Sequence, residues 1–411
     1  MKFDTVIIGG GLSGLACGIR LQKKGVKCAI VSAGQSALHF FSGSFELLNR
    51  LPDGTAVVNP VEAVKSLDAN HPYSKIGDGF AKYAAEAKQL LVDSGVEVNG
   101  EAEKNELHLT PMGTLKPSWL TLADFNRFSS ADEFNGKKVV VANIAGFLDF
   151  NMKFVTDALE AMGAECKQEL IRLDEVDRLR KSPTEMRAAN IARVLDKENV
   201  HNQLLTILKN YSIGVDAVVL PAVVGLASQK LVKALREEVP SAVLVPTMPP
   251  SVSGIRTQQQ LRREFERLGG VYMLGDSVVK ADVEGDKVKA VYTINHAEIG
   301  LVADNYILTT GSFFSNGLVA HSAEVVEPVF GLDVDFAADR ADWCDQQFFN
   351  KQNYQTFGVA TDDHFRVKKN GSAIANLYAA GSVLSGANAL YEGCGAGVAL
   401  LSALFVADNL K

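Results

Sequence analysis

The sequence has few cysteines, and they do not form a metal-binding motif. The five cysteines lie far apart, and no two of them are separated by only two residues. Iron–sulfur clusters and structural zinc sites are built from closely spaced cysteine pairs. The sequence therefore predicts no iron–sulfur cluster and no metal site. Cys17 and Cys28 stand in apolar surroundings, which favours buried free thiols over metal ligands.

Long apolar runs and basic patches are also missing. Apolar stretches such as residues 398–407 fall well short of the ~20 residues that span a bilayer. The net charge of −7 argues against a nucleic-acid partner. The first residues enter a predicted strand at once, which leaves no room for a signal peptide. We therefore expect a cytoplasmic protein that needs a partner to attach to a membrane.

The amino-terminal residues carry the most informative motif of the chain. A β-branched strand over residues 5–8 runs into Gly9-x-Gly11-x-x-Gly14, and a helix is predicted over residues 15–24. Gly9 allows a sharp turn, Gly11 lets a phosphate approach the backbone, and Gly14 lets the helix pack closely on the strand. The free N–H groups of the first helical turn then face the anion. This order predicts a nucleotide-binding unit; the alternative is a tight turn without a ligand.

The motif lacks the acidic residue that usually ends the second strand, predicted here over residues 26–31. That carboxylate grips a ribose hydroxyl of NAD or FAD. Ser32 stands in its place, and no carboxylate lies nearby in the sequence. A serine is a weaker, neutral partner. Either other residues hold the adenosine, or the ligand is FMN, which has none.

Further glycine turns follow later in the chain. Two predicted strands end at Gly311 and Gly381, and residues 391–397 place a glycine cluster before an apolar helix over residues 398–410. A helix N-terminus aimed at N1 and O2 of a reduced flavin stabilises the negative charge there. The order of these turns favours a flavin site; the alternative is that the glycines only permit close helix packing.

The alternation of strands and helices predicts an α/β fold. We expect a Rossmann-like flavin-binding domain of the two-domain flavoprotein type, made of residues 1–45 and 250–411. An inserted α/β cap or substrate domain is expected over residues 46–249. Within the second part of the flavin-binding domain, residues 271–293 are predicted to form a three-stranded meander with turns near Gly275 and Gly285.

On these residues the chain resembles the two-domain flavoproteins of the fumarate reductase and succinate dehydrogenase type. The matching segments are residues 7–15, 307–313 and 377–381. A closer resemblance is to the B-subunit family of anaerobic glycerol-3-phosphate dehydrogenases. It covers residues 1–410, and its specific segments are residues 36–44, 249–256, 311–318 and 392–395.

The resemblance implies a flavin subunit of a complex that oxidises sn-glycerol 3-phosphate to dihydroxyacetone phosphate and passes electrons to a quinone. It also implies a second flavin subunit that completes the catalytic dimer, and an iron–sulfur subunit that anchors the complex at the inner face of the cell membrane. FMN is expected ahead of FAD, because Ser32 and Ser382 replace acids that hold the ribose and the ribitol in the broader pattern. The alternatives are a fumarate reductase-type flavoprotein acting on another substrate, such as a dicarboxylate, and a non-catalytic electron-relay or assembly subunit.

The predicted site residues come from the glycine turns, from the loop after the second strand, and from the chemistry of alcohol oxidation. Oxidising a secondary alcohol needs a base for the hydroxyl proton, and His39 is the candidate; it could also donate a hydrogen bond to the flavin or simply pack in its loop. Arg256 is the candidate ligand for a substrate phosphate, unless it forms a surface ion pair. The predicted cofactor-binding residues are Gly9, Gly11, Gly14, Ser32, Ser42, Gly43, Ser44, Gly311, Gly381, Ser382, Gly393, Cys394, Gly395, Ala396 and Gly397.

Overall fold

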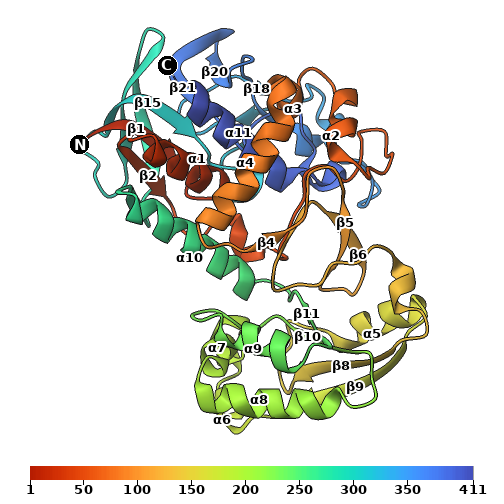
Figure 1. Ribbon diagram of the computed structural model, residues 1–411. Coiled ribbons are helices and arrows are strands. Elements are labelled where there is room, and N and C mark those ends of the chain that lie inside the picture. The colour runs from red at the N-terminus through yellow and green to blue at the C-terminus, as the bar shows by residue number, and fades with distance from the viewer. Residues whose placement is uncertain (411) are drawn as a thin grey trace.

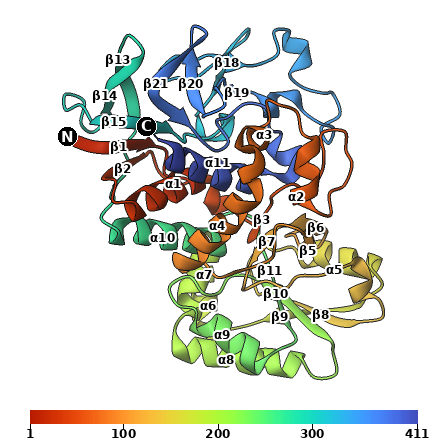
Figure 2. The same cartoon turned by 45° about the horizontal axis from the view of Figure 1, so that its top comes forward.

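The computed structural model describes residues 1–410, and its largest sheet is the predicted Rossmann-like unit (Figures 1 and 2). Neighbouring strands of this sheet are parallel except for the last pair, β21 and β20, which is antiparallel. The six strands are, in spatial order, β12 (Val271–Leu274), β2 (Cys28–Ser32), β1 (Lys2–Ile8), β15 (Val302–Leu308), β21 (Ser372–Ala379) and β20 (Arg366–Lys369).

The amino-terminal strand–turn–helix unit forms where the glycine motif predicts it. Helix α1 (Leu12–Lys23) begins three residues before the predicted start, because Gly11 already serves as its N-cap in an extended conformation (φ −81°, ψ −168°). The helix ends at Lys23 with Lys24 as its C-cap, and Gly25 follows with a positive φ of 79°. A left-handed conformation there suits glycine, so the chain turns back into β2 without strain.

Helices pack together around α1 and α11 on one face of the large sheet. Helix α1 contacts α11 (Gly395–Asn409) and α10 (Val252–Arg267), while α11 also contacts α4 (Phe80–Asp93) and α3 (Pro72–Ile76). Figure 1 shows α1, α4 and α11 lying together beside the sheet. Helix α11 is apolar around most of its circumference, as expected for a helix enclosed by neighbours.

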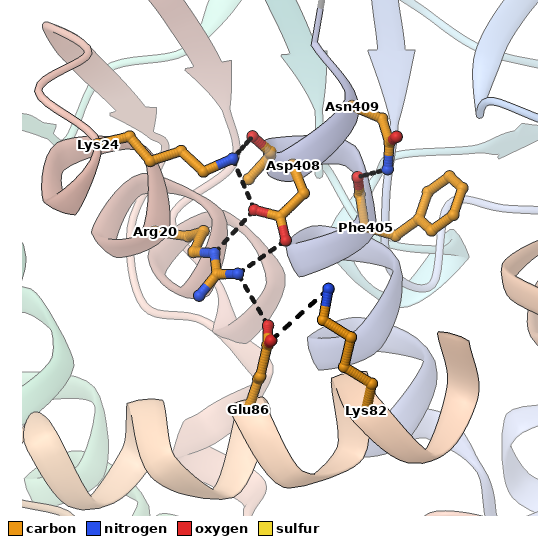
Figure 3. Close-up of polar contacts among 8 residues, drawn as sticks. Arg20, Lys24, Lys82, Glu86, Phe405, Asp408 and Asn409 are labelled. Carbon is orange, nitrogen blue, oxygen red and sulfur yellow. Dashed lines mark hydrogen bonds and ion pairs between the residues drawn. The ribbon is translucent and has the colours of Figure 1, made fainter. Parts of the chain in front are cut away.

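A network of charged side chains joins three of these helices at the surface (Figure 3). Asp408 of α11 accepts hydrogen bonds from both the Nε and an Nη atom of Arg20 on α1, at 2.8 and 2.7 Å. Lys24 approaches the same carboxylate at 2.6 Å, and Arg20 also pairs with Glu86 of α4 at 2.8 Å. Burial raises the pKa of Asp408, but the hydrogen bonds from Arg20 and Lys24 outweigh it and bring that pKa down to about 2.

We expect the Asp408→Asn variant to be less stable at pH 7 by roughly 1–3 kcal/mol, because it loses charge-assisted hydrogen bonds. The pKa of Asp408 lies below that of an unfolded aspartate (~3.9), so its contribution is complete above about pH 4 and disappears as the pH falls towards 2. Denaturant unfolding at several pH values measures this. The control is Asp157→Asn, which breaks an exposed pair on one helix and should cost well under 1 kcal/mol; equal losses in the two variants contradict the prediction.

A second, smaller parallel sheet lies apart from the large one in both views (Figures 1 and 2). Its strand order is β11 (Ala242–Val245), β10 (Ala217–Pro221), β8 (Lys138–Ile144) and β9 (Glu165–Ile171). Its helices are α5 (Met152–Ala161), α6 (Asp174–Asp177), α7 (Ala188–Leu195), α8 (Glu198–Tyr211) and α9 (Lys230–Glu238). This is the α/β cap that the alternation of strands and helices predicts.

The first part of the predicted insert packs differently. Helices α3 and α4 lie against α11, and a small sheet packs on α4 and α11. Its strands are, in spatial order, β3 (Ser44–Phe45), β7 (Leu120–Leu122) and β4 (Val98–Asn99). The hairpin β5 (Glu106–Leu109)–β6 (Leu115–Ser118) and helix α2 (Pro60–Ala63) complete this region. The division of the chain at residues 46 and 249 therefore stays a prediction, since the inserted segment packs in two parts.

The predicted meander over residues 271–293 is wrong in one respect. Strand β12 joins the large sheet parallel to β2, and only β13 (Val278–Glu284) and β14 (Lys287–Thr293) form a hairpin. The chain turns away after β12 at Gly275 (φ 76°), and the backbone amides of Gly275 and Asp276 both donate to the carbonyl of Ser32. A strand of four residues, such as β12, is too short for its sequence to indicate which strand it pairs with.

The remaining strands form two short antiparallel pairs, β16 (Val319–Ala320) with β17 (Val325–Val326), and β18 (Val334–Asp335) with β19 (Gly358–Val359). Among residues 1–410, no helix has both the length and the apolar character needed to cross a membrane.

Candidate cofactor site

The glycines in the turn between β1 and α1 have two different roles. Gly9 and Gly14 allow close packing of the backbone, whereas Gly11 leaves space for a ligand. A Cβ atom on Gly9 would overlap the carbonyl of Thr309, and one on Gly14 would overlap the carbonyl of Gly9. A Cβ on Gly11 would meet only Ser36 Cβ, at 3.8 Å. No side chain caps the N-terminus of α1. The structure thus leaves a space above uncapped amides at Gly11, which fits a phosphate group.

Three strand ends bring the other glycine turns to the same edge of the sheet. Thr309, which follows β15, donates from Oγ1 to the carbonyl oxygens of Ile8 and Gly9 at 3.1 and 2.9 Å. A Cβ on Gly381, after β21, would lie 2.8 Å from the Cβ of Ser13 at the start of α1. Parallel α/β sheets bind ligands at this carboxyl edge.

The structure also brings Gly311 and Ser382 together at this edge. A Cβ on Gly311 would lie 3.6 Å from the Ser382 hydroxyl oxygen. Both Gly311 and Gly381 have a φ of 81°, so each turn needs the left-handed conformation that glycine adopts without cost. These predicted residues therefore occupy one contiguous region around the first turn of α1.

The end of β2 is polar but carries no acid. The hydroxyl of Ser32 donates to the carbonyl oxygen of Gly34 at 3.1 Å. Beside it, the hydroxyl of Tyr272 on β12 donates to the carbonyl oxygen of Gly10 at 3.1 Å. Sequence reasoning missed Tyr272, because the meander prediction placed β12 away from β2. Two neutral hydroxyl groups thus stand where the usual carboxylate is missing.

The serine loop after β2 and the glycine turn before α11 meet through Glu46. Ser42 and Ser44 share a hydrogen bond between their hydroxyl oxygens at 3.1 Å, and Ser44 donates to Glu46 Oε1 at 2.8 Å. The backbone amide of Gly397 donates to the carbonyl oxygen of Glu46 at 2.9 Å. Gly43 has a φ of 84° and packs on the ring of Phe125. The backbone amide of Gly397, one of the predicted cofactor-binding residues, is therefore already hydrogen-bonded within the chain.

The turn over residues 393–395 packs closely against Asn49. Gly393 has a φ of 59°, and a Cβ there would lie 2.6 Å from the side-chain nitrogen Nδ2 of Asn49. Cys394 is the N-cap of α11, is fully buried and provides no side-chain cap. Burial raises the pKa of its thiol well above the usual value, and the nearby Glu392 raises it further. Cys394 is thus a packed, protonated thiol rather than a nucleophile.

A buried group of side chains beneath this turn was not predicted. His71, Glu392 and Cys394 place a nitrogen, an oxygen and a sulfur within 4.8 Å of one another. Nδ1 of His71 accepts a hydrogen bond from the backbone amide of Tyr73 at 3.1 Å, so in the neutral ring Nε2 carries the proton. Nε2 then has no lone pair for a metal ion and instead faces Glu392 Oε2 at 3.3 Å.

His39 lies half-buried in the one-turn helix Ala37–Phe40, against the start of α10. Its carbonyl oxygen accepts a hydrogen bond from the amide of Ser251 at 2.8 Å. Burial lowers the pKa of His39, while a hydrogen bond with Gln258 opposes this effect. The imidazole is therefore neutral at pH 7, as a general base requires. Its role as base stays a prediction.

His108 is a second histidine beside the serine loop, and no sequence pattern marks it as a site residue. Its Nε2 donates to the carbonyl oxygen of Ser42 at 2.9 Å, and its ring packs edge-on against Phe125. Burial lowers the pKa of His108 to about 4. The residue lies in the strand segment Glu-Leu-His-Leu, which looks like an ordinary half-buried strand.

Arg256 is buried and already paired within the chain. Its side chain is only 7% exposed, and Nη1 donates to the carbonyl oxygen of Gly225 at 2.8 Å. Nη2 forms an ion pair with Asp124. The guanidinium thus links α10 to the loops after β7 and β10, and its charge is already neutralised. The structure gives no support to Arg256 as a ligand for substrate phosphate.

The parallel sheet with glycine turns at its carboxyl edge, together with a separate α/β cap, is the arrangement expected for a two-domain flavoprotein. Residues 4–398 match the family model described as "FAD binding domain". The chain is 45% identical to the B subunit of anaerobic glycerol-3-phosphate dehydrogenase from Yersinia enterocolitica, over 100% of this chain and 98% of that protein. The corresponding proteins of Pectobacterium atrosepticum and Glaesserella parasuis are 43% and 38% identical, each over 100% of this chain and 99% of the relative. The chain therefore belongs to the B-subunit family of anaerobic glycerol-3-phosphate dehydrogenases, within the FAD-binding domain family.

Two solved flavoprotein structures match this chain at low sequence identity and with TM-scores below 0.5. Escherichia coli quinol fumarate reductase matches 99% of this chain and 69% of its own with a TM-score of 0.46 and 9% identity. The 3-ketosteroid Δ1-dehydrogenase of Sterolibacterium denitrificans matches 99% of both chains with a TM-score of 0.45 and 10% identity. Neither match bears on the reaction. The family membership supports a flavin and points to FAD, so the predicted preference for FMN is not supported.

Proposed function

We propose that this chain is the flavin-carrying subunit of a complex that oxidises sn-glycerol 3-phosphate to dihydroxyacetone phosphate and delivers the electrons to a quinone. The observation that carries the proposal is the full-length identity of 38–45% to proteins named as the B subunit of the anaerobic enzyme. The open space at Gly11, above the uncapped start of α1, supports the cofactor part of the proposal.

FAD is the proposed cofactor. The α1 N-terminus at Gly11 would hold the phosphates, the turns at Gly311 and Gly381 would line the middle of the cofactor, and the α11 N-terminus would face its pyrimidine end. The bound flavin supplies the hydride acceptor. His39, kept neutral by its partly buried position, is the proposed acceptor of the hydroxyl proton.

Acid treatment of the purified chain is expected to release FAD in a 1:1 ratio. The hydroxyls of Ser32 and Tyr272, which replace the usual carboxylate, already donate to backbone carbonyls and would accept hydrogen bonds from the adenosine ribose through their lone pairs. Chromatography of the released flavin identifies it. Recovery of FMN alone contradicts this proposal, because FMN has no adenosine for these hydroxyls to hold.

The proposed partners are a second flavin subunit and an iron–sulfur subunit. The relatives are named as one subunit of an enzyme, which supports a multi-subunit assembly. The five cysteines of this chain are far apart and include three buried thiols, Cys17, Cys28 and Cys394. Onward electron transfer to a quinone therefore needs another chain. We further propose that this partner holds the complex at the inner face of the membrane.

The isolated chain is expected to show little glycerol 3-phosphate oxidation with a quinone analogue, and co-expression with the two partner subunits should restore it. Steady-state assays of both preparations, with the flavin content of each measured, test this. Full quinone-linked turnover by the isolated chain contradicts the need for partners. If the assembled complex oxidises or reduces a dicarboxylate and has no activity on glycerol 3-phosphate, the proposal that glycerol 3-phosphate is the substrate is wrong.

A further inference from the structure

The Glu392 carboxylate is buried at the base of the glycine turn with little to neutralise it. Its side chain is 3% exposed. Among residues 1–410, the only basic side chain within ion-pairing distance is His71, with Nε2 at 3.3 Å from Oε2. The same oxygen also accepts a hydrogen bond from the backbone amide of Asn388 at 3.2 Å. The thiol of Cys394 lies 3.6 Å from the same oxygen. An ionised carboxylate with only these neutral groups beside it has no counter-charge.

The contacts of His71 show which ring nitrogen can face the carboxylate as an N–H group. Nδ1 accepts from the amide of Tyr73, as the cap of helix α3, so in the neutral ring the proton is on Nε2. Nε2 lies 3.3 Å from Glu392 Oε2 but forms no hydrogen bond with it, and it has no other hydrogen-bond partner among residues 1–410. The neutral His71 ring therefore places a polar N–H group beside the carboxylate but no positive charge, and the pair carries a charge of −1 while Glu392 is ionised.

The other polar groups around the pair do not cancel this charge. Burial raises the pKa values of the Tyr73 phenol and the Cys394 thiol well above their usual ranges, so both stay neutral. Tyr73 donates to the carbonyl oxygens of Leu47 and Cys394 at 2.6 and 3.2 Å. Glu46, the nearest other acid, pairs with Lys116 at 2.7 Å.

The backbone of Glu392 places the pair directly before the α11 N-terminus. Glu392 lies in the π-helical turn Ala389–Gly393, and its carbonyl oxygen accepts from the amides of Asn49 and Arg50 at 2.8 and 3.0 Å. The guanidinium of Arg50 lies over the ring of Tyr391, 5.2 Å from its centre. The N-cap Cys394 is only two residues away. A carboxylate here opposes the partial positive charge that the α11 N-terminus offers to a ligand.

We propose that Glu392 lowers the reduction potential of the flavin by placing a buried negative charge behind the α11 N-terminus. Glu392 and His71 are positioning residues, and the inference rests on the proposed flavin site. Reduction adds negative charge to the pyrimidine end of a flavin, and an ionised Glu392 disfavours it electrostatically.

The test compares the reduction potential of the full-length chain, reconstituted with FAD, before and after Glu392→Gln. Glutamine keeps the size and an acceptor oxygen but cannot ionise. The variant is expected to have a more positive midpoint potential, measured by equilibration with redox dyes during dithionite titration.

Glu327→Gln is the matched control. Glu327 is equally buried and accepts hydrogen bonds from the amides of Val329 and Phe330 at 3.1 and 2.7 Å, but it lies outside the glycine turns. Its neutralisation should change thermal stability and leave the potential unchanged. Equal potentials for wild-type and Glu392→Gln chains overturn the inference, and so do equal shifts in the two variants.

His71→Asn gives an independent test that also applies if Glu392→Gln does not fold. The asparagine oxygen can replace Nδ1 as the acceptor for the Tyr73 amide, but the Nε2 donor is lost. Without the partial positive charge of this N–H group, the negative charge of Glu392 is less compensated, and the midpoint potential should move in the negative direction. An unchanged potential overturns the inference. Because dithionite supplies the electrons, failure of the assembled complex to oxidise glycerol 3-phosphate would overturn the proposed function and leave this result standing; a chain that binds no flavin overturns both.

Discussion

The Gly11→Val variant should fold normally and bind no flavin. The Gly11 backbone is extended (φ −81°, ψ −168°), a conformation that valine adopts readily, and a Cβ there would meet only Ser36 at 3.8 Å. The added side chain occupies the proposed place of the phosphate and separates it from the amides of α1. Losing even two charge-assisted hydrogen bonds of ~1.5–3 kcal/mol each weakens binding by more than about 100-fold.

Flavin absorbance after reconstitution measures whether the variant binds flavin. The circular dichroism of the unliganded chain measures whether it folds. Gly34→Val is the control, since a Cβ on Gly34 would meet nothing within 4 Å and the residue lies outside the turn. By contrast, Gly14→Val should fail to fold, because its side chain would overlap the Gly9 carbonyl. Full flavin occupancy in Gly11→Val would place the phosphate site elsewhere.

The second large effect is expected for Arg256→Ala, which should destabilise the fold by about 3–5 kcal/mol. Asp124 would then keep a nearly buried negative charge without a partner, and the carbonyl of Gly225 would lose its donor. Denaturant unfolding gives the free energy. The substrate dependence of the assembled complex should change little in the fraction of molecules that remains folded, because this guanidinium already has its partners.

Arg262→Ala on the same helix is the control. Arg262 pairs with Glu266 one turn along, both are about one-third exposed, and the loss should stay below about 1 kcal/mol. The double variant Arg256→Met, Asp124→Leu should recover much of the stability, since no charge is left unpaired. A large rise in the KM for glycerol 3-phosphate with unchanged stability would restore Arg256 as a substrate ligand.

The sequence was sufficient for the features that depend on local backbone rules. The positions of Gly9, Gly11 and Gly14 fix a strand, a turn and a helix start within fifteen residues, and the structure has them there. The glycines at 311 and 381 also mark true strand ends. Each of these glycines satisfies a local conformational demand, so a single sequence reveals it.

The rest of the site depends on partners that are distant in the sequence. Arg256 and Asp124 are 132 residues apart, and nothing near Arg256 shows that it is already paired. The same holds for His71, which meets Glu392 only because α3 packs under α11. Tyr272 was missed because the partner of a short strand is set by the whole sheet. Long-range pairing therefore decides which polar residues are free for chemistry.

The large sheet pairs the first strand of the chain with strands from its last third, and this has a consequence for biosynthesis. Lys2 of β1 is opposite Val302 of β15, and Arg20 pairs with Asp408 near the end of the chain. At ~5–20 residues per second, the ribosome needs tens of seconds to supply these partners. The cap sheet is built from nearby segments and can fold first, while β1 and its apolar neighbours stay exposed. Newly made chains should thus depend on chaperones until α11 emerges, and cofactor loading should be strictly post-translational.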